Sequence, residues 1–393
     1  MDYAFNTDQR LLKESVERFV AQRYTFERRK KIVASKEGYS PEIWRAFADM
    51  GLLAMPFGEE SGGLGGGPLE TMIVMQAFGR GMVVEPYLPT VILAGGLLRH
   101  GGSRAQRQAL IPAIADGTSR HAFAFVEAQG RYNPANVRTS AARSGGGYRI
   151  NGSKAVVLGA PMAEGFFVTT RTAGADCDPL GISVFYVESR AKGVTRSDYE
   201  NIDGTRASEV VFDDVQVGAD AVVGELDHGL PLVERVLDEA TAAVCAEACG
   251  AMSALNEKTL EYARSRVAFG QPIVGFQVIQ HRLVDMRVAC EYAAAVSLMA
   301  TLKLNASAAE RTRAVSAAKS MIGRDSRFVG QNAIQLHGAI GMTDDLDIGH
   351  YFKRLTVIGL LFGNSDHHLR RFWGQWRGTG TASADAGKIP EKA

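Results

Sequence analysis

One stretch of the sequence stands out: Arg264–Ile273, which reads RSRVAFGQPI, together with Phe276 and Gln277 just after it. Apolar residues at helical spacing lead into this stretch and out of it. We therefore expect one helix to end in basic residues at a Gly-Pro turn and another to begin. Taken alone, the stretch is also typical of any helical hairpin whose cations are stabilised by the dipole at a helix C-terminus.

The flanking sequence predicts a bundle of long helices. Segments 230–266, 276–305 and 308–336 each look like a single helix, and long helices joined by short loops are typical of a bundle. The third segment runs into Ile334–Met342, which reads IQLHGAIGM. Glycines at that point would let another group approach the backbone closely. Neither stretch by itself identifies a function.

Helices are also predicted for the first 118 residues. Thr7 is a plausible N-cap, and Ser40, which is followed by proline, is a strong helix start. Apolar stretches of helical length occupy 69–79 and 87–99. The glycine-rich segment 62–68 between them could be interpreted as a phosphate loop. No strand precedes it, however, and no GxGxxG spacing fits, so we expect a connecting turn.

The period of the pattern changes near residue 120. Turn clusters separate short segments rich in β-branched and aromatic residues, at 122–126, 154–158, 166–170, 182–187 and 210–212. Because no helical pattern lies between these predicted strands, we expect an antiparallel β domain rather than a Rossmann sheet.

Composition excludes several classes of protein. With 44 Lys+Arg against 43 Asp+Glu, the net charge of +1 argues against an electrostatic nucleic-acid binder. No apolar run reaches the roughly 20 residues of a membrane span, and the start carries no secretory pattern. Four cysteines in 393 residues do not form a disulfide framework. We expect a cytoplasmic protein.

Common catalytic motifs are missing. Asp366, His367 and His368 could suggest a metal site, but adjacent helical positions point in different directions, so we expect none. Cys245 and Cys249 lie four residues apart in a run of alanines, which favours close helix packing over redox chemistry.

Together, the RxxFG…FQ stretch, the QxxG stretch and the order helices–strands–helices resemble the acyl-CoA dehydrogenase flavoprotein family. The resemblance extends from residue 1 to about 376. Small, polar residues beyond it predict a flexible tail (377–393). The resemblance implies an α+β fold of three parts: an N-terminal α-helical domain (1–118), a middle antiparallel β-barrel or sandwich domain (119–229) and a C-terminal four-helix bundle (230–376). It also implies tetramers built from dimers, with FAD held extended between two subunits.

By this resemblance, one group of residues would face the ADP half of an FAD across the dimer. The group consists of Arg266, Phe269, Gln277, Gln335 and Gly338, and Asp366 is assigned to the same cofactor. A guanidinium can bind a pyrophosphate through two hydrogen bonds, and a glycine admits its backbone.

The chain departs from the family where the catalytic base is expected. The base is a glutamate that removes the α-proton of the thioester, and Phe362 occupies its position. Some relatives place the glutamate on the first bundle helix, where this chain has Ala240. Glu239 is adjacent but would point about 100° away around the helix. The catalytic residue is therefore unknown, with Glu239, or Asp238 beside it, as a weak candidate.

Five positions that the family uses around the reacting atoms are altered: Val126, Val156, Leu158, Thr241 and Phe362. The residues that would contact the FAD of a neighbouring subunit, by contrast, match the family pattern. Within the family, the stretches CAEACGAM, GFQVIQHRLVDM, IQLHGAIGMT and GHYFKRLT resemble the small subunit of heteromeric enzymes like pimeloyl-CoA dehydrogenase. Comparable non-catalytic partners occur in dehydrogenases of bacterial steroid catabolism.

The leading hypothesis is thus an FAD-dependent acyl-CoA dehydrogenase subunit of a heterotetramer. Its partners would be an acyl-CoA thioester, a catalytic large subunit and electron-transferring flavoprotein as acceptor. Two alternatives stay open: a self-sufficient flavoenzyme with a relocated base, and a flavin-free scaffold subunit. The acyl group is not specified by the sequence.

Overall fold

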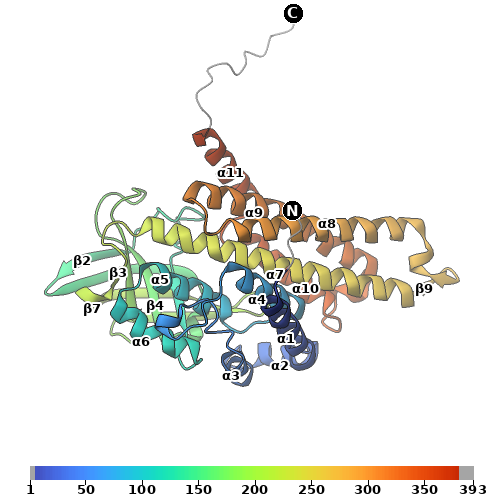
Figure 1. Ribbon diagram of the computed structural model, residues 1–393, viewed down its shortest axis with the longest axis horizontal. Helices are drawn as coiled ribbons and strands as arrows, with labels where there is room; N and C mark the ends of the chain where they lie inside the picture. Colours follow the sequence, from blue (N-terminus) through green and yellow to red (C-terminus); the bar gives the residue numbers. More distant parts are fainter. Residues whose placement is uncertain (1–4, 380–393) are drawn as a thin grey trace, which may run out of the picture.

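The computed structural model describes residues 5–379, and its N-terminal part is helical as predicted (Figure 1). The N-cap of the first helix is Asn6, one residue before the predicted Thr7, because Asn6 and Gln9 form a capping box. Ser40 caps the third helix as expected. The elements are α1 (Thr7–Arg23), α2 (Phe26–Ala34), α3 (Pro41–Asp49), η1 (Glu59–Ser61), α4 (Pro68–Gly81), η2 (Leu88–Ala94), α5 (Gly95–Gly101) and α6 (Arg104–Ala115).

A sheet follows, with the strand order β6-β7-β3-β2-β4-β5-β8 and with β1 beside β4. Its strands are β1 (His121–Ala124), β2 (Ser140–Ser144), β3 (Gly147–Leu158), β4 (Gly165–Arg171), β5 (Ile182–Glu188), β6 (Val194–Glu200), β7 (Arg206–Gly218) and β8 (Val222–Val223).

Most pairs of strands are antiparallel, as predicted, but β1 and β2 pair with β4 in parallel, which makes the sheet mixed. A parallel pair needs a long connection, and the loop after β1 together with the β2–β3 hairpin provides it. The short η3 (Ala160–Met162) and η4 (Ala219–Ala221) lie at strand ends.

The C-terminal part is a helical bundle that runs along the molecule (Figure 1). Its elements are α7 (Leu230–Ser265), β9 (Val267–Ala268), β10 (Gln271–Pro272), η5 (Ile273–Gly275), α8 (Gln277–Leu302), α9 (Ala308–His337), η6 (Gly338–Met342), α10 (Ile348–Leu360) and α11 (Ser365–Thr379). The expected tail therefore begins inside α11, and residues 380–393 lie outside the described part of the chain. In residues 5–379, no helix combines the length and apolarity that crossing a bilayer requires.

Helices α4 and α7 pack with their backbones almost in contact. A Cβ atom at Gly79 would lie 1.9 Å from the Glu247 carbonyl oxygen, and one at Gly250 would lie 1.9 Å from that of Gln76. The Cys245–Ala251 run is buried within the chain. Its small residues therefore serve close helix packing, as predicted, but inside one subunit rather than against a partner.

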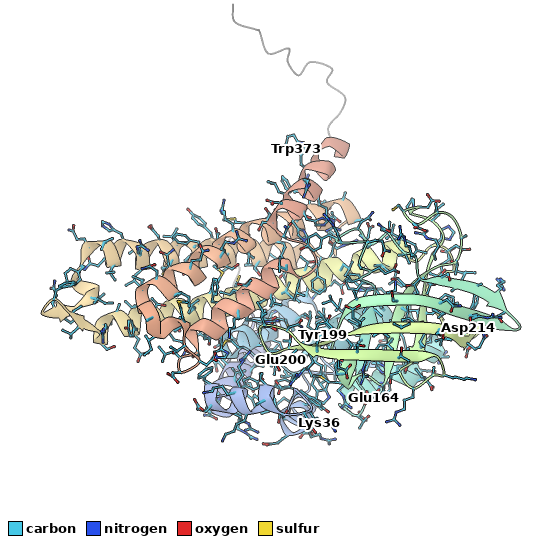
Figure 2. All side chains as sticks on the ribbon, turned by 180° about the vertical axis from the view of Figure 1, so that it is seen from behind. Lys36, Glu164, Tyr199, Glu200, Asp214 and Trp373 are labelled. Atoms are coloured by element: carbon cyan, nitrogen blue, oxygen red, sulfur yellow. The ribbon has the colours of Figure 1, made fainter. Side chains whose placement is uncertain are left out.

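Charged side chains buried between the three parts hold them together. Arg354 of α10 donates to Glu247 of α7 at 2.6 and 2.7 Å and to Asp203 of the β6–β7 loop at 2.7 Å. Arg29 of α2 donates to the Asp203 carbonyl oxygen at 2.6 Å. Lys36, which follows α2, and Glu164, which precedes β4, both line a groove, and Figure 2 labels the two side chains.

We propose residues 1–118, 119–229 and 230–376 as the three domains. These limits fall in the connections between α6 and β1 and between β8 and α7.

Candidate functional site

The first group of predicted residues lies at the end of the bundle that is remote from the sheet, around the β9–β10 hairpin (Figure 1). Arg266 is the C-cap of α7, Phe269 is 96% exposed and Gln277 is the first residue of α8. Within the described residues, no hydrogen bond or ion pair engages the Arg266 side chain. Its guanidinium is therefore free to bind a ligand.

The end of α9 is held beside the end of α7 by an aromatic pair. The rings of Tyr262 and His337 stack at 4.3 Å, and the Tyr262 hydroxyl donates to the His337 carbonyl oxygen at 3.4 Å. This contact brings Gln335 and Gly338 to the same end of the bundle as Arg266. Gly338 has φ +68° and open space where a Cβ would stand. An exposed cation beside an unobstructed glycine backbone fits a pyrophosphate.

Asp366 is not brought together with the other five residues. It lies in the first turn of α11, which packs against the middle of α9: a Cβ at Gly323 would lie 2.5 Å from the Ser365 hydroxyl, and His368 contacts Ser316.

The second group surrounds a cavity of about 410 Å³ between the sheet, α7 and the α10–α11 turn. Four of the five altered positions line it: Val126, Val156, Leu158 and Phe362. Thr241 does not line this cavity, and its hydroxyl donates to the Leu237 carbonyl oxygen at 2.6 Å along its own helix. The structure thus brings four of the five positions together at one cavity and leaves Thr241 outside its lining.

The turn that carries Phe362 is fixed from both sides. Phe362 has φ +58°, and its ring stacks with that of Phe125 at a centroid distance of 6.4 Å. The buried ammonium of Lys319 donates to the carbonyl oxygens of Gly363 at 2.7 Å and Gly359 at 3.3 Å. His368 donates through Nε2 to the Phe362 carbonyl oxygen at 3.1 Å. Phe362 is therefore an ordered part of the cavity wall.

Burial without a carboxylate partner lowers the pKa of Lys319 to about 8, because the charged form loses its hydration. Burial also lowers the pKa of His368 to about 3, which keeps the imidazole neutral and able to donate. The sequence did not single out Lys319, and it raised His368 only as a possible metal ligand. A lone lysine on the buried face of a helix was the signal that could have identified Lys319.

One carboxylate lines the cavity among the described residues, and it is already engaged. Glu127 accepts from the Lys154 ammonium at 2.6 Å and from the backbone amides of Arg138 at 2.9 Å and Thr139 at 3.1 Å. Burial would raise the pKa of Glu127, but the neighbouring Lys154 charge and these hydrogen bonds lower it to about 2. A carboxylate of this kind is a structural anion rather than a proton acceptor.

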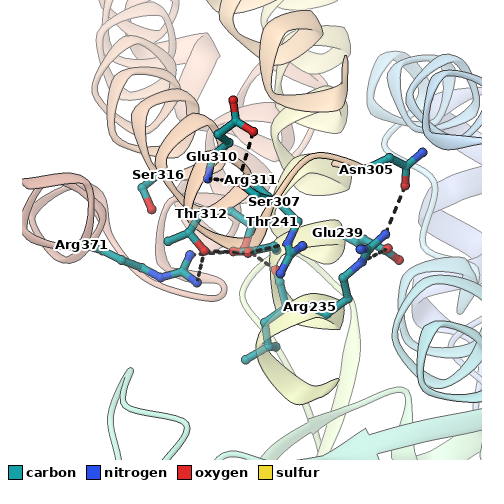
Figure 3. Close-up of polar contacts among 12 residues, drawn as sticks. Arg235, Glu239, Thr241, Asn305, Ser307, Glu310, Arg311, Thr312, Ser316 and Arg371 are labelled. Carbon is teal, nitrogen blue, oxygen red and sulfur yellow. Dashed lines mark hydrogen bonds and ion pairs between the residues drawn. The ribbon is translucent and has the colours of Figure 1, made fainter. Parts of the chain in front are cut away.

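Neither acid proposed as a relocated base lines this cavity. Figure 3 shows the contact of Glu239 with Arg235. Glu239 instead lines a separate cleft and accepts from Arg99 at 2.8 Å, His100 at 2.8 Å and Arg235 at 3.1 Å. Burial favours a higher pKa for Glu239, but the His100 hydrogen bond and the Arg99 charge outweigh burial and lower it to about 2.

Asp238, the other candidate, is buried beside two cations. It accepts from Arg371 at 2.6 Å and from Arg311 and Thr312 at 3.1 Å each. Both acids therefore join helices to one another.

Comparisons with known proteins extend over almost the whole chain. Models of the N-terminal, middle and C-terminal domains of acyl-CoA dehydrogenases match residues 6–118, 122–215 and 227–372. A probable acyl-CoA dehydrogenase of Bacillus subtilis, YngJ, is 26% identical over 377 residues, with 93% of this chain and 97% of that protein covered. The human mitochondrial short-chain specific acyl-CoA dehydrogenase is 27% identical over 323 residues, covering 81% of this chain and 78% of that protein.

Solved structures show the same fold. Butyryl-CoA dehydrogenase from Megasphaera elsdenii is similar with a TM-score of 0.88 at 23% identity, covering 96% of this chain and all of that one. A chain of the ChsE4-ChsE5 complex from Mycobacterium tuberculosis has a TM-score of 0.88 at 25% identity, with 97% of this chain and 100% of that chain covered.

Proposed function

Since this chain belongs to the acyl-CoA dehydrogenase family, we propose that it is a subunit of an FAD-dependent enzyme that desaturates acyl-CoA thioesters and that a partner chain supplies the catalytic base. In such an enzyme the bound flavin accepts the hydride that leaves the β-carbon of the acyl group. The residues of this chain contribute a binding surface for the cofactor rather than the proton acceptor.

One observation carries the proposal. The ordered side chain of Phe362 stands in the cavity wall, and the one carboxylate among the described wall residues, Glu127, is held as an anion by Lys154. General-base catalysis requires an acceptor within hydrogen-bond reach of the proton, with a pKa suited to the task. A phenyl ring cannot accept a proton, and a carboxylate with a pKa near 2 is a poor base.

The exposed end of the bundle supports the cofactor part of the proposal. Arg266, Gln335 and Gly338 lie together there, with a free guanidinium and an unobstructed backbone. An arginine exposed in this way suits the pyrophosphate of an FAD that is shared with another subunit, and Phe269 and Gln277 extend the same surface. Asp366 would belong to the opposite half-site of the same enzyme.

A heteromeric assembly is the arrangement in which such a chain can work. The similar chain from Mycobacterium tuberculosis comes from a complex of two different proteins, ChsE4 and ChsE5. By analogy, we place a catalytic large subunit across the dimer, with electron-transferring flavoprotein as the acceptor.

The test is to purify this chain alone and together with the family-related partner recovered with it from its native source. We expect no flavin absorbance in the chain alone, and both flavin and acyl-CoA oxidation in the complex. Flavin and activity in the chain alone would establish a self-sufficient enzyme instead. Absence of any effect of this chain on the flavin of the partner would indicate a scaffold.

Replacing Arg266 tests the cofactor surface. Arg266→Ala should weaken FAD retention in the complex about ten- to a hundredfold, since a hydrogen bond to a charged group contributes about 1.5–3 kcal/mol. Arg264→Ala, two residues away and also exposed, is the control and should retain FAD normally. The measurement is flavin occupancy after dialysis, and equal occupancy in the two variants would exclude this assignment.

A further inference from the structure

Glu85, which follows α4, is buried where the ends of several helices meet. It is 5% exposed. The Ser40 backbone amide, at the N-cap of α3, donates to Glu85 Oε1 at 3.3 Å. The Tyr24 hydroxyl, at the C-cap of α1, accepts from the Val84 amide at 3.0 Å and also hydrogen-bonds with the Glu85 carboxyl group. Glu85 thus lies at the junction of α1, α3 and α4.

The carboxyl group of Glu85 is not fully satisfied at this junction. Glu85 lines a small cavity of about 50 Å³ whose wall is mostly apolar and includes Met75, Phe78, Leu88 and Leu158. Within residues 5–374, Glu85 Oε2 is buried and has no hydrogen-bond partner. An ionised carboxylate buried in this way would lose its hydration without compensation, so the neutral acid is favoured.

The cations on the wall of this small cavity are already balanced by other carboxylates. Arg206 of β7 pairs with Glu200 at 3.1 Å, and a water in the cavity can satisfy its unpartnered Nε atom. Arg354 of α10 pairs with Glu247 at 2.6 Å and with Asp203 at 2.7 Å. In the described part of the chain, no ion pair engages the carboxyl group at the junction.

The other groups at the junction leave Glu85 as the one that titrates near neutral pH. Burial raises the pKa of Glu85 to about 7, although the hydrogen bond with Tyr24 acts in the opposite direction. Burial raises the pKa of Tyr24 as well, so its hydroxyl stays neutral. Arg29 of α2, the cation that acts on Tyr24, donates to the carbonyl oxygens of Met82 at 2.9 Å and Asp203 at 2.6 Å.

We propose that Glu85 is a proton-binding switch: as a neutral acid it holds the ends of α1, α3 and α4 together, and its ionisation loosens this junction. The folded chain keeps a proton that the unfolded chain releases, because the folded pKa of Glu85 lies above the ordinary value of 4.5. The stabilisation by the neutral acid is therefore complete below pH 4.5 and is lost as the pH rises through 7. The switch requires neither flavin nor a partner chain.

Amide hydrogen exchange of the full-length chain, or of its complex where the chain requires a partner, measures the loosening. Glu85→Gln keeps the size of the side chain but cannot ionise. The ratio of the wild-type exchange rate to that of Glu85→Gln, at the peptides that contain Ser40 and Val84, should rise about ten- to a hundredfold from pH 5 to pH 8. Because each ratio compares two chains at one pH, the intrinsic pH dependence of exchange cancels.

A matched control and a second readout locate the proton. Glu37→Gln changes an exposed glutamate three residues before Ser40 and should exchange like the wild type at both pH values. Infrared spectra of the folded chain detect the protonated carboxyl group directly. The wild type should show its band at pH 6 and lose it by pH 8, and Glu85→Gln should lack this change.

Three results would overturn the inference: a ratio of exchange rates that does not change with pH, the same ratio change in Glu37→Gln as in Glu85→Gln, or a carboxyl band that persists in Glu85→Gln. If Glu85→Gln does not fold, the infrared titration of the wild type decides. A folded wild type that loses no protonated carboxyl group between pH 6 and pH 8 has no such switch.

Discussion

At the scale of single residues, the proposed lack of a catalytic base depends on Phe362. The turn around it is held by Lys319 and His368, so its backbone is as well fixed as a catalytic residue would require. The side chain, however, stacks on Phe125 and completes an apolar wall. Under the proposed function, this position offers no proton acceptor.

Phe362→Glu should therefore not create a dehydrogenase. The new carboxylate would lie beside Leu361 and Phe125, where burial raises its pKa and the lost ring packing lowers stability by about 1–3 kcal/mol. We expect a lower melting temperature and no acyl-CoA oxidation by the chain alone. Phe362→Leu loses the ring but adds no charge, so it separates the stability lost with the ring packing from the stability lost by burying a carboxylate. Acyl-CoA oxidation by the Glu variant alone would show a competent site that lacked only its base.

Glu239 predicts a measurable dependence of stability on acid. Its pKa near 2 in the folded chain is below the ordinary value of 4.5, so its contribution is present above pH 4.5 and disappears as the pH falls toward 2. Glu239→Gln should lower the free energy of unfolding at pH 7 by on the order of 2 kcal/mol. In this variant the free energy of unfolding should also fall less steeply between pH 4.5 and pH 2.

Chemical denaturation across that pH range measures the effect. Glu42→Gln makes the same change in an exposed ion pair with Arg23 and Arg28 and should alter stability little. If the free energy of unfolding changed with pH in the same way in the wild type and in Glu239→Gln, the predicted contribution of Glu239 would be contradicted.

At the scale of elements, the close approach of α4 and α7 depends on glycine. Gly79→Ala should destabilise the chain by about 1–3 kcal/mol, because its Cβ would overlap the Glu247 carbonyl oxygen. Gly359→Ala in α10 meets nothing within 4 Å and should be neutral or stabilising by about 0.5–1 kcal/mol. Melting temperatures from circular dichroism test this contrast, and equal shifts in both variants would contradict it.

The elements that the sequence predicted well are those with strong periodic patterns. Helix α7 was predicted for 230–266 and spans Leu230–Ser265, and α9 was predicted for 308–336 and spans Ala308–His337. Strands β2 and β6 were missed because both are mostly exposed and contain few apolar residues. The parallel pairing of β1 with β4 was missed because neighbouring strands in space are not neighbours in sequence.

The candidate site was predictable only in part, for a related physical reason. Motif residues such as Arg266 and Gly338 could be named from the sequence, and the stacking of Tyr262 on His337 brings them together. The anchors of the Phe362 turn could not be named, since Lys319 lies far from it along the chain and acts through backbone carbonyls. A hydrogen bond from a side chain to a backbone carbonyl far away in the chain produces no local sequence pattern from which it could be predicted.

At the scale of the whole molecule, α8 leaves an apolar face uncovered. Val284, Val288 and Tyr292 follow one another at helical spacing and are 60%, 45% and 59% exposed. The small-residue run of α7, by contrast, is already buried against α4. An oligomer of this chain would therefore bury α8 rather than the Cys245–Ala251 run.

We predict that the chain, alone or with its family-related partner, is an oligomer that buries the α8 face, since exposed apolar patches of this kind mark interaction surfaces. Val284→Asp combined with Val288→Asp should shift the assembly toward monomer, because two carboxylates would have to be desolvated in the interface. Val211→Asp changes a similarly exposed valine on strand β7 and should leave the assembly intact. Light scattering after size-exclusion chromatography at micromolar concentration gives the mass. A wild-type monomer with and without its partner, or a double variant of unchanged mass, would exclude α8 as the interface.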